Sequence, residues 1–295
     1  MDESSKIHFV LPFKARRPAG GFRVMYEYAN RLFDKGYSVH ISYPLQTPYM
    51  KYRFPYWIRL ILSRIEGFGT NKWFKFREGI SMSYIKCVKD QYIKDADIIM
   101  ATWWATVAEV GKLSEKKGKK INLIQGFENW EGHEDLLYKS YDIPDMTNVV
   151  VASYLKDIVG EHTDKETILI PNAIDKKQYK IMNPIKNRYS NSICMFFSEQ
   201  EIKGSKYGLE ALSIVKKRKP DVKADIFGIY PKPEHLPNWI EYHRNPNNLC
   251  EIYNRNAIFI SNSLTEGFGL VSVEAMHCGC ALICTDISGH REYAF

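Results

Sequence analysis

The chain has 295 residues, of which 45% are hydrophobic and 25% charged, and its formal net charge is +7. These values are ordinary for a soluble protein with a buried core, and the length predicts two domains, because domains usually hold roughly 100–200 residues. The modest positive charge does not choose among an anionic substrate, a nucleic acid and a membrane surface as partner.

The sequence carries no recognisable targeting segment. Residues 1–6 have no apolar run behind a basic head, and no apolar stretch approaches the ~20 residues of a membrane-spanning helix. The six cysteines form no CxxC pair, which favours reduced thiols. We therefore expect a cytoplasmic protein, which can still touch a membrane at its surface.

Short apolar runs alternate with helical patterns in the first half, which predicts βαβ units and a parallel sheet. The predicted elements are a strand at 7–11, a helix at 22–34 that stops near Gly36, and strands at 39–43, 97–101, 121–124 and 149–152. A further strand runs into Pro171-Asn172 and ends there, because proline cannot donate to a ladder. We place the domain boundary at Asn172, which gives domains of residues 1–172 and 173–295.

A second series of the same kind follows the boundary. It predicts strands at 193–197, 224–227, 258–261 and 281–284, and helices at 207–217 and 270–277. His277, Cys278, Cys280 and Cys284 lie close together but match no common zinc spacing. We interpret them as a helix end, a turn at Gly279 and a buried strand, and we predict no metal site.

Residues 49–77 depart from this pattern, because they combine aromatic and basic side chains. The aromatic residues are Tyr52, Phe54, Tyr56, Trp57, Trp73, Phe74 and Phe76, and the basic ones are Lys51, Arg53, Arg59, Arg64, Lys72, Lys75 and Arg77. One face of a predicted helix carries Trp57, Ile58, Ile61, Leu62 and Ile65, and the other carries Arg59, Ser63 and Glu66. Three interpretations stay open: packing on its own domain, contact with a membrane surface or lipid acceptor, and nucleic-acid stacking. No nucleic-acid-binding motif accompanies the segment, so we expect no nucleic-acid partner.

The strongest chemical signal is the stretch from Asn262 to Met276. A predicted strand ends just before it, a turn with Gly267 and Gly269 follows, and a helix begins near Gly269. Ligands of open α/β sheets bind at such strand ends, and free N–H groups at a helix start attract phosphate. Glycines let the backbone come close to the ligand.

Two glutamates accompany this turn, and each has two interpretations. Glu266 either faces the group attached to the phosphate or caps the helix. Glu274 either accepts hydrogen bonds from vicinal hydroxyls, as on a ribose, or is a solvated surface acid. Their joint presence with the glycines favours the functional interpretation.

These residues resemble a known family. The stretch EGFGLVSVEAMHCGCALICTDISGHRE, with Glu266 and Glu274, resembles the C-terminal donor site of family 4 glycosyltransferases, which have the GT-B fold. The segment 170–175 resembles their interdomain IPNGID, and Gly20-Gly21 resembles their N-domain glycine loop. Trp103-Trp104 and the 124–128 segment resemble the rhamnosyltransferase-like members.

The resemblance implies an α/β protein of two Rossmann-like domains whose parallel sheets face a central cleft. Residues 1–172 would form the acceptor-side domain and residues 173–295 the nucleotide-sugar-binding domain. The implied reaction moves a hexose or deoxyhexose, such as rhamnose, from a nucleotide-diphosphate sugar to a glycan or glycolipid with retention. Its implied setting is the synthesis of a cell-surface polysaccharide or capsule.

The resemblance also assigns roles to residues. Glu266 would face the transferred sugar, Glu274 the ribose and Lys203 the diphosphate, so Glu266 and Lys203 are the catalytic candidates. The remaining nucleotide-sugar candidates are Gly20, Gly21, Lys206, Gly267, Phe268, Gly269 and Leu270. The acceptor-side candidates are Trp103, Trp104, Gln125 and Glu128.

The sequence departs from the family pattern at four places, the first of which is Ala173 in place of the glycine of IPNGID. Ser198 stands where many members have an arginine, and Lys206 is the candidate substitute for the missing charge. Gln125 stands where many have a histidine, and it cannot carry a proton. The chain ends at Phe295, where members usually continue, so we expect a C-terminal domain that is incomplete by that comparison.

The inventory of residues predicts chemistry without a metal or other cofactor. Helix N–H groups and Lys203 can stabilise an anionic leaving group, and Asp95-Ala96-Asp97 precedes its strand instead of following it. A dehydrogenase is disfavoured, because G-x-G-x-x-G is missing. A glycosidase, a nucleotide-sugar epimerase of the same fold and a non-catalytic nucleotide-sugar binder remain as alternatives.

Overall fold

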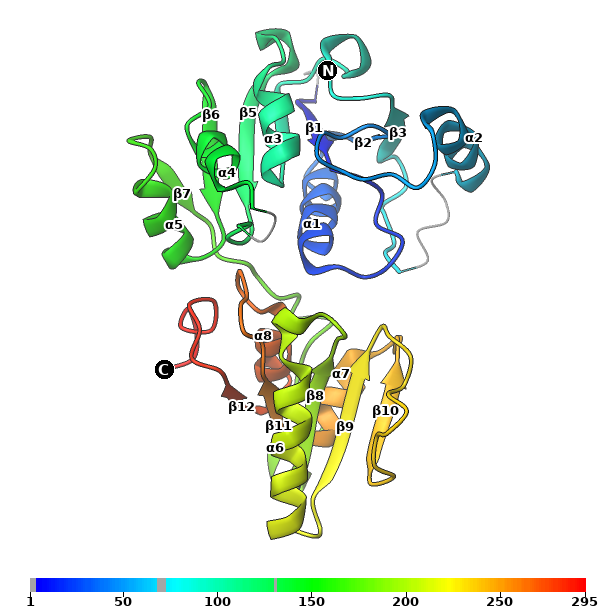
Figure 1. The fold of residues 1–295 in the computed structure, drawn as a ribbon, viewed down its shortest axis with the longest axis vertical. Coiled ribbons are helices and arrows are strands. Elements are labelled where there is room, and N and C mark those ends of the chain that lie inside the picture. The colour runs from blue at the N-terminus through cyan, green and yellow to red at the C-terminus, as the bar shows by residue number, and fades with distance from the viewer. Residues whose placement is uncertain (1–3, 68–72, 130–131) are drawn as a thin grey trace. The chain divides into compact units, whose positions relative to one another are not determined.

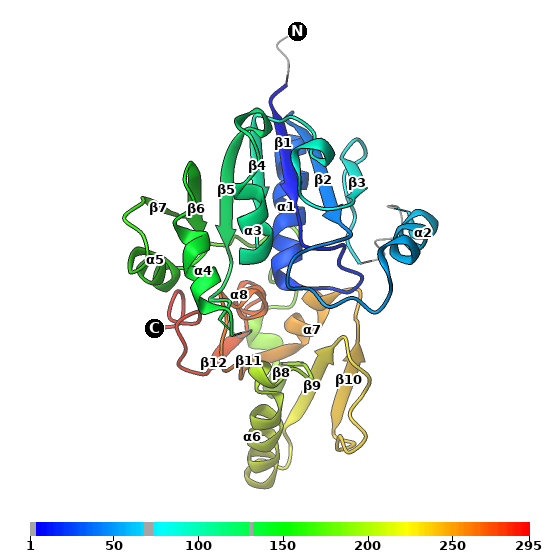
Figure 2. The ribbon, with the colours of Figure 1, turned by 45° about the horizontal axis from the view of Figure 1, so that its top comes forward.

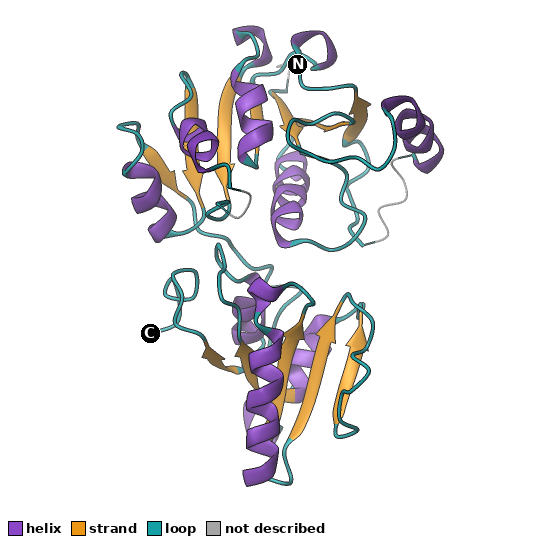
Figure 3. Cartoon of the chain, in the orientation of Figure 1, coloured by secondary structure: helices purple, strands orange, loops and turns teal. Residues whose placement is uncertain are grey.

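The computed structural model describes residues 4–67, 73–129 and 132–295 (Figure 1). The chain divides into two compact units, Met1–Pro171 and Asn172–Phe295, called unit 1 and unit 2 below. Each contains a parallel sheet with helices on its faces, as Figure 3 shows by element type. Within the described residues, no helix has the length and apolar character that crossing a membrane requires.

Unit 1 is built on a seven-stranded parallel sheet of order β3-β2-β1-β4-β5-β6-β7. Its elements are β1 (Lys6–Val10), α1 (Gly20–Asp34), β2 (Ser38–Pro44), α2 (Tyr56–Glu66), β3 (Ser81–Ile85), β4 (Ile98–Ala101), α3 (Trp104–Gly111), β5 (Lys119–Ile124), α4 (Glu134–Tyr141), β6 (Met146–Val150), α5 (Ser153–Gly160) and β7 (Thr167–Leu169). The strand order reverses between β1 and β4. In open α/β sheets ligands bind at such a switch point, outside the carboxyl ends of the strands.

Unit 2 repeats the plan with five parallel strands of order β10-β9-β8-β11-β12. Its elements are β8 (Tyr189–Phe197), the short 3-10 turn η4 (Glu201–Lys203), α6 (Ser205–Arg218), β9 (Lys223–Gly228), β10 (Ile240–Arg244), α7 (Leu249–Arg255), β11 (Asn256–Ser261), α8 (Leu270–His277) and β12 (Ala281–Cys284). Here the strand order reverses between β8 and β11. The loops that leave these two strands are therefore the expected ligand-binding loops of unit 2.

Two apolar clusters cover the two faces of the unit 2 sheet. On one face, α6 places Leu212 against Met195 and Ile226; on the other, α7 and α8 place Tyr253 and Ala275 against Phe259. Burial on both faces of the sheet explains the apolar runs 193–197 in β8 and 257–260 in β11. These two strands fix the starting points of the two ligand-binding loops.

The prediction of a buried strand at 281–284 is wrong. β12 pairs only with β11 and lies at the edge of the described sheet, and Ile283 is 55% exposed. The helix end and the turn at Gly279 are as expected, since Cys278 caps α8 and Gly279 has φ +89°. The apolar character of this strand was mistaken for full burial.

A buried pair of histidines lies between β1, β2 and β3 in unit 1. His8 and His40 meet edge to face with ring centroids 4.8 Å apart, and His8 shares a 2.8 Å hydrogen bond with the Ser42 hydroxyl. The pKa of His8 is lowered to about 3, chiefly by burial and then by the neighbouring His40. Burial likewise lowers the pKa of His40 to about 4.

This pair predicts that unit 1 loses stability in mild acid. Both pKa values lie below the ordinary 6.5, so the unfolded chain takes up protons first as the pH falls. The free energy of unfolding should therefore be greatest above pH 6.5 and should decrease steadily toward pH 4. Urea unfolding at several pH values, with His8→Asn and His40→Asn beside the exposed control His235→Asn, tests this. NMR titration of the rings in the native chain gives a check that does not depend on the variants, and normal titration of both rings would contradict it.

Candidate functional site

The two loops that leave β8 and β11 are in direct contact. Asn262 donates its side-chain N–H to the Lys203 carbonyl at 2.7 Å, and the Leu264 N–H donates to the Ile202 carbonyl at 2.8 Å. Gly204 has φ +58°, and a Cβ placed on it would lie 2.0 Å from the Asn262 carbonyl oxygen. The contact therefore requires glycine at this position, both for its backbone conformation and for its lack of a side chain.

This contact brings together the two predicted catalytic residues. Lys203 Nζ lies 2.7 Å from Glu266 Oε1, and the Ser263 hydroxyl donates to the same carboxylate oxygen at 2.8 Å. The two charged side chains remain partly open to solvent, with exposed fractions of 22% and 15%. The site thus presents a cation and a carboxylate next to each other at the end of β11.

Helix α8 begins beside this pair. Its N-cap is Gly269, with φ +84°, and no side-chain hydrogen bond caps the helix. The N-cap position thus belongs to Gly269 and not to Glu266. The first-turn N–H groups of a helix have no intrahelical acceptor, and with the helix dipole they favour an anion such as phosphate.

Glu274 lies on α8 and is not a solvated surface acid. It is only 2% exposed, and the buried Tyr253 hydroxyl donates to its Oε2 at 3.2 Å. Burial raises the pKa of Tyr253 well above its usual value, and the charge of Glu274 raises it further. Tyr253 therefore remains a protonated donor that holds the carboxylate in place.

The residues after β12 position the loop between β11 and α8, and we did not predict this role from the sequence. His290 is buried and shares hydrogen bonds with the Ser261 hydroxyl at 3.0 Å and with the Thr285 carbonyl at 2.9 Å. The Tyr293 hydroxyl donates to the Gly269 carbonyl at 3.2 Å. A Cβ on Gly289 would lie 2.4 Å from the Glu266 carbonyl oxygen. The Gly-His pair after a strand was the only sequence signal for this support.

Three other residues that were predicted to bind the nucleotide sugar lie close to Gly269 in the chain. Phe268 is nearly buried and packs on the Tyr293 ring, with centroids 5.5 Å apart, while Gly267 and Leu270 are partly exposed on either side of Gly269. Ser198 is buried in a turn, where its hydroxyl accepts from the Gln200 N–H at 3.2 Å.

Lys206 is the predicted substitute for the missing charge at Ser198. It is exposed in the first turn of α6, with its ammonium group 5.9 Å from the Tyr207 ring centroid. No contact among the described residues ties it to Glu266 or Lys203, so its role in binding stays a prediction.

The predicted acceptor-side residues of unit 1 gather at the switch point of its sheet. Gln125 follows β5 and donates to the Gly21 carbonyl and to the Thr102 hydroxyl, each at 3.2 Å. Gly21 lies in the first turn of α1, directly after Gly20. The Glu128 carboxylate accepts a hydrogen bond from the backbone N–H of Trp104 at 3.1 Å, so it supplies a negative charge at the N-terminus of α3.

Strained backbone and aromatic rings mark the same end of unit 1. Tyr49 and Trp103 have φ values of 65° and 68°, which side-chain-bearing residues rarely adopt. The Trp104 ring contacts the rings of Tyr49 and His133, with centroids 4.9 and 5.5 Å away. Trp104 is buried, and its indole N–H has no acceptor in the part of the chain that the structure describes. Strain and unmet hydrogen bonds of this kind concentrate at functional sites.

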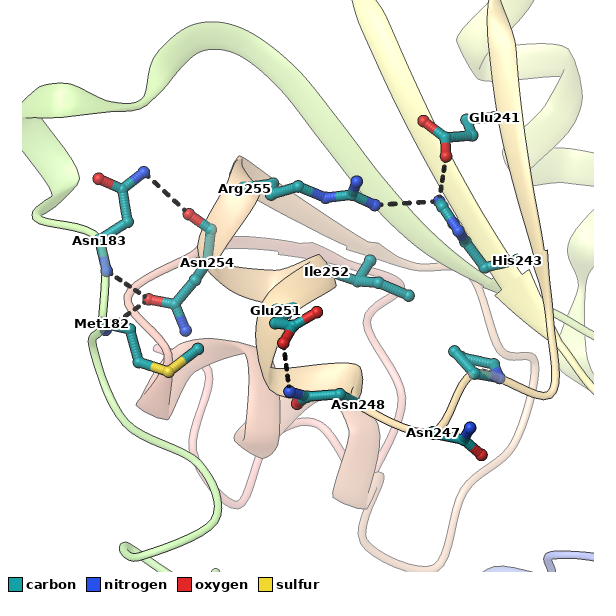
Figure 4. Close-up of a pocket in the computed structure, with 11 residues that line it drawn as sticks. Met182, Asn183, Glu241, His243, Asn247, Asn248, Glu251, Ile252, Asn254 and Arg255 are labelled. Atoms are coloured by element: carbon teal, nitrogen blue, oxygen red, sulfur yellow. Dashed lines mark hydrogen bonds and ion pairs between the residues drawn. The ribbon is translucent and has the colours of Figure 1, made fainter.

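A separate cavity of about 610 Å³ lies between β10, α7 and the chain before β8 (Figure 4). Glu241 and His243 line this cavity, and Asp225 lies beside it. One potential metal-ligating atom from each of the three side chains lies within 4.8 Å of the other two, a spacing that would suit a metal ion. The Arg255 guanidinium already lies 3.3 Å from Asp225 Oδ1 and 3.2 Å from His243 Nε2, so a positive charge balances this group. None of the predicted donor residues lines this cavity.

Comparisons with known proteins agree with this geometry. Residues 192–294 match the family model of the glycosyl transferases group 1. No curated protein matches the sequence significantly.

Several solved structures have the same fold. TarM of S. aureus superposes with a TM-score of 0.68 at 11% identity, covering 96% of this chain and 86% of TarM. HepE of Anabaena, solved with UDP and glucose, gives 0.67 at 14% identity over 98% of this chain and 82% of HepE. Starch synthase IV of Arabidopsis thaliana, solved with ADP and acarbose, gives 0.63 at 14% identity over 99% of this chain and 85% of that domain. The chain thus has the GT-B fold, and its residues 192–294 match the group 1 glycosyltransferase model.

Proposed function

We propose that the chain is a glycosyltransferase that takes a sugar from a nucleoside-diphosphate sugar. The observation that carries this proposal is the Lys203–Glu266 ion pair, 2.7 Å long, beside the uncapped start of α8. An anion-binding helix end, a lysine and a carboxylate are the groups that a diphosphate and its attached sugar require. The match of residues 192–294 to the group 1 model supports the same assignment.

Each donor residue has a defined task in this proposal. Lys203 and the first-turn N–H groups of α8 stabilise the negative charge that grows on the departing phosphate, without a metal. Glu266 stabilises the positive charge that grows on the anomeric carbon. Glu274 binds the ribose hydroxyls, and Tyr253 orients its carboxylate.

The transfer step breaks the bond between the anomeric carbon and the phosphate oxygen and forms a bond from that carbon to an acceptor hydroxyl oxygen. The hydroxyl proton passes to the departing phosphate, because Gln125 cannot carry it. The new bond forms on the face that the phosphate leaves, so configuration is retained. The acceptor is a glycan or lipid-linked glycan bound at the end of unit 1 that carries Tyr49 and Trp103.

The finer assignments rest on the sequence resemblance. It favours a hexose or deoxyhexose such as rhamnose as the transferred sugar, and the synthesis of a cell-surface polysaccharide or capsule as the setting. The reaction would take place in the cytoplasm.

We expect a nucleoside diphosphate to bind the chain in the presence of EDTA, and Glu274→Gln to weaken that binding. The substitution keeps the acceptor for Tyr253 but removes the charge that binds the ribose, at a cost of about 1.5–3 kcal/mol. Calorimetric titration with UDP, ADP and GDP measures it, with the exposed Glu210→Gln as the matched control. Loss of binding in EDTA would contradict the metal-free model, and equal affinities of the two variants would remove Glu274 from the site.

A transfer assay with the parent chain distinguishes the alternative functions. Incubation with nucleotide sugars and a panel of glycan acceptors should release nucleoside diphosphate only when an acceptor is present. Conversion of the donor sugar without an acceptor would indicate an epimerase. Tight nucleotide binding with no turnover on any donor would indicate a non-catalytic binding protein.

A further inference from the structure

Helix α2 of unit 1 turns its apolar face to solvent. Trp57, Ile61 and Ile65 follow one another at four-residue spacing, so they form one stripe along the helix, and they are 61%, 50% and 78% exposed. Phe54, just before the helix, and Leu62, next to Ile61 in the chain, are also exposed. An amphipathic helix normally buries such a stripe in its own domain. The exposed stripe is therefore not what packs this helix on its own domain.

The polar face of α2 attaches the helix to unit 1 instead. Arg59 donates to the carbonyl groups of Phe54 and Leu45, and its guanidinium lies 3.5 Å from the Tyr52 ring centroid. Glu66 at the end of the helix pairs with Arg16 at 2.9 Å and with Lys14 at 3.8 Å. These contacts hold the helix so that its apolar stripe faces outward. Figures 1 and 2 both show α2 beside the edge strand β3 of the unit 1 sheet.

Positive charge accompanies the exposed stripe. Lys51 and Arg53, which precede the helix, and Arg64 within it are exposed. Residues 49–77 contain seven lysines and arginines against the single acid Glu66. That acid is paired with unit 1. Lys72 belongs to the same segment but lies outside the described residues.

We propose that α2 is an interfacial helix that binds unit 1 to an anionic lipid surface, with Trp57, Ile61 and Ile65 inserted among the acyl chains. Its 11 residues are too few to span a bilayer, whereas a tryptophan and aliphatic stripe flanked by basic residues suits the headgroup boundary. The aliphatic side chains of Ile61, Leu62 and Ile65 offer nothing that stacks on or hydrogen-bonds to bases, which disfavours nucleic acid. This inference goes beyond the proposed sugar transfer and does not depend on it.

Flotation with lipid vesicles tests this proposal. The full chain should bind vesicles of phosphatidylcholine mixed with phosphatidylglycerol, and should bind far less to phosphatidylcholine alone. The triple variant Trp57→Gln/Ile61→Gln/Ile65→Gln should lose binding to both. Replacing Lys51, Arg53 and Arg64 by glutamine should weaken binding only to the anionic vesicles, by about fivefold for each charge removed.

The matched control is Ile181→Gln/Ile214→Gln, which removes two isoleucines of unit 2 that are about as exposed as Ile61. Because all of these side chains face solvent, every variant should unfold at nearly the temperature of the parent chain. Unchanged vesicle binding by the triple variant would overturn the proposal. So would a parent chain that binds no vesicles but forms a dimer in analytical ultracentrifugation that the triple variant does not form, because the stripe would then bind a second copy.

Discussion

Glu266→Gln should abolish most sugar transfer while it leaves nucleotide binding nearly unchanged. Glutamine keeps the shape of the side chain and can still accept from the Ser263 hydroxyl, which donates to Glu266 Oε1 at 2.8 Å. It removes the negative charge that the proposed mechanism places beside a carbon that becomes positive only in the transition state. Loss of one such electrostatic contact typically lowers turnover on the order of 10²–10³-fold. Steady-state rates and calorimetric affinity for the nucleoside diphosphate measure the two effects separately.

The control for this substitution is Glu210→Gln, which removes an exposed acid of α6 in the same unit. It should leave turnover and affinity at the parent values. If Glu266→Gln instead lost turnover and nucleotide affinity by the same factor, Glu266 would only shape the binding site. Because Lys203 loses its ion-pair partner in this variant, Lys203→Met should be measured beside it. That variant should lose both turnover and affinity, since the proposed mechanism places the lysine on the diphosphate.

Gly204→Ala should unfold unit 2 at a markedly lower denaturant concentration and prevent nucleotide binding. Alanine at φ +58° costs about 1–2 kcal/mol, and its Cβ would overlap the Asn262 carbonyl oxygen 2.0 Å away, which adds about 1–3 kcal/mol. Separation of the two loops would also move Lys203 away from Glu266. Urea unfolding measures the loss of stability, and calorimetric titration of the folded variant with UDP measures the loss of nucleotide binding.

Gly36→Ala separates the two causes of that effect. Gly36 also has a positive φ, +92°, but a Cβ there would meet nothing within 4 Å. Its substitution should cost only the conformational penalty of about 1–2 kcal/mol and leave nucleotide binding intact. Equal costs for the two variants would show that the loops of unit 2 separate freely, and the described contact would not govern the site.

The sequence was most informative where local patterns decide the structure. The prediction of a helix at 270–277 is confirmed residue by residue by α8, because the strand, the glycine turn and the apolar helix follow each other without interruption. The parallel α/β class is confirmed by both sheets. Strands β3 and β10 were not predicted, because SMSYI and IEYHR are edge strands with few apolar residues.

Contacts between distant segments could not be predicted in the same way. The sequence placed Lys203 and Glu266 on separate loops, and it is the contact between these loops, with Gly204 against Asn262, that brings their side chains to 2.7 Å. Apart from the Gly289-His290 pair, no sequence pattern indicated that His290 and Tyr293 support the loop between β11 and α8. The periodicity of α2 identified its apolar face, but it could not tell whether that face meets the domain or the solvent.

The arrangement of the two units around a central cleft stays a prediction. A cleft would bring the donor loops of unit 2 and the aromatic residues of unit 1 to the same acceptor sugar. Cross-linking between engineered cysteines at Tyr49 and Leu264, both exposed, with and without nucleotide sugar would test it.

A crystal structure of the chain with UDP or ADP tests the central claim most directly. We predict diphosphate density at the start of α8, with phosphate oxygens near the Leu270 N–H and the Lys203 ammonium and the ribose next to Glu274. The Lys203–Glu266 distance, 2.7 Å in the free chain, should lengthen as the lysine turns toward phosphate. Diphosphate bound instead in the cavity lined by His243 and Asn248, with the Lys203–Glu266 pair unchanged, would contradict the account.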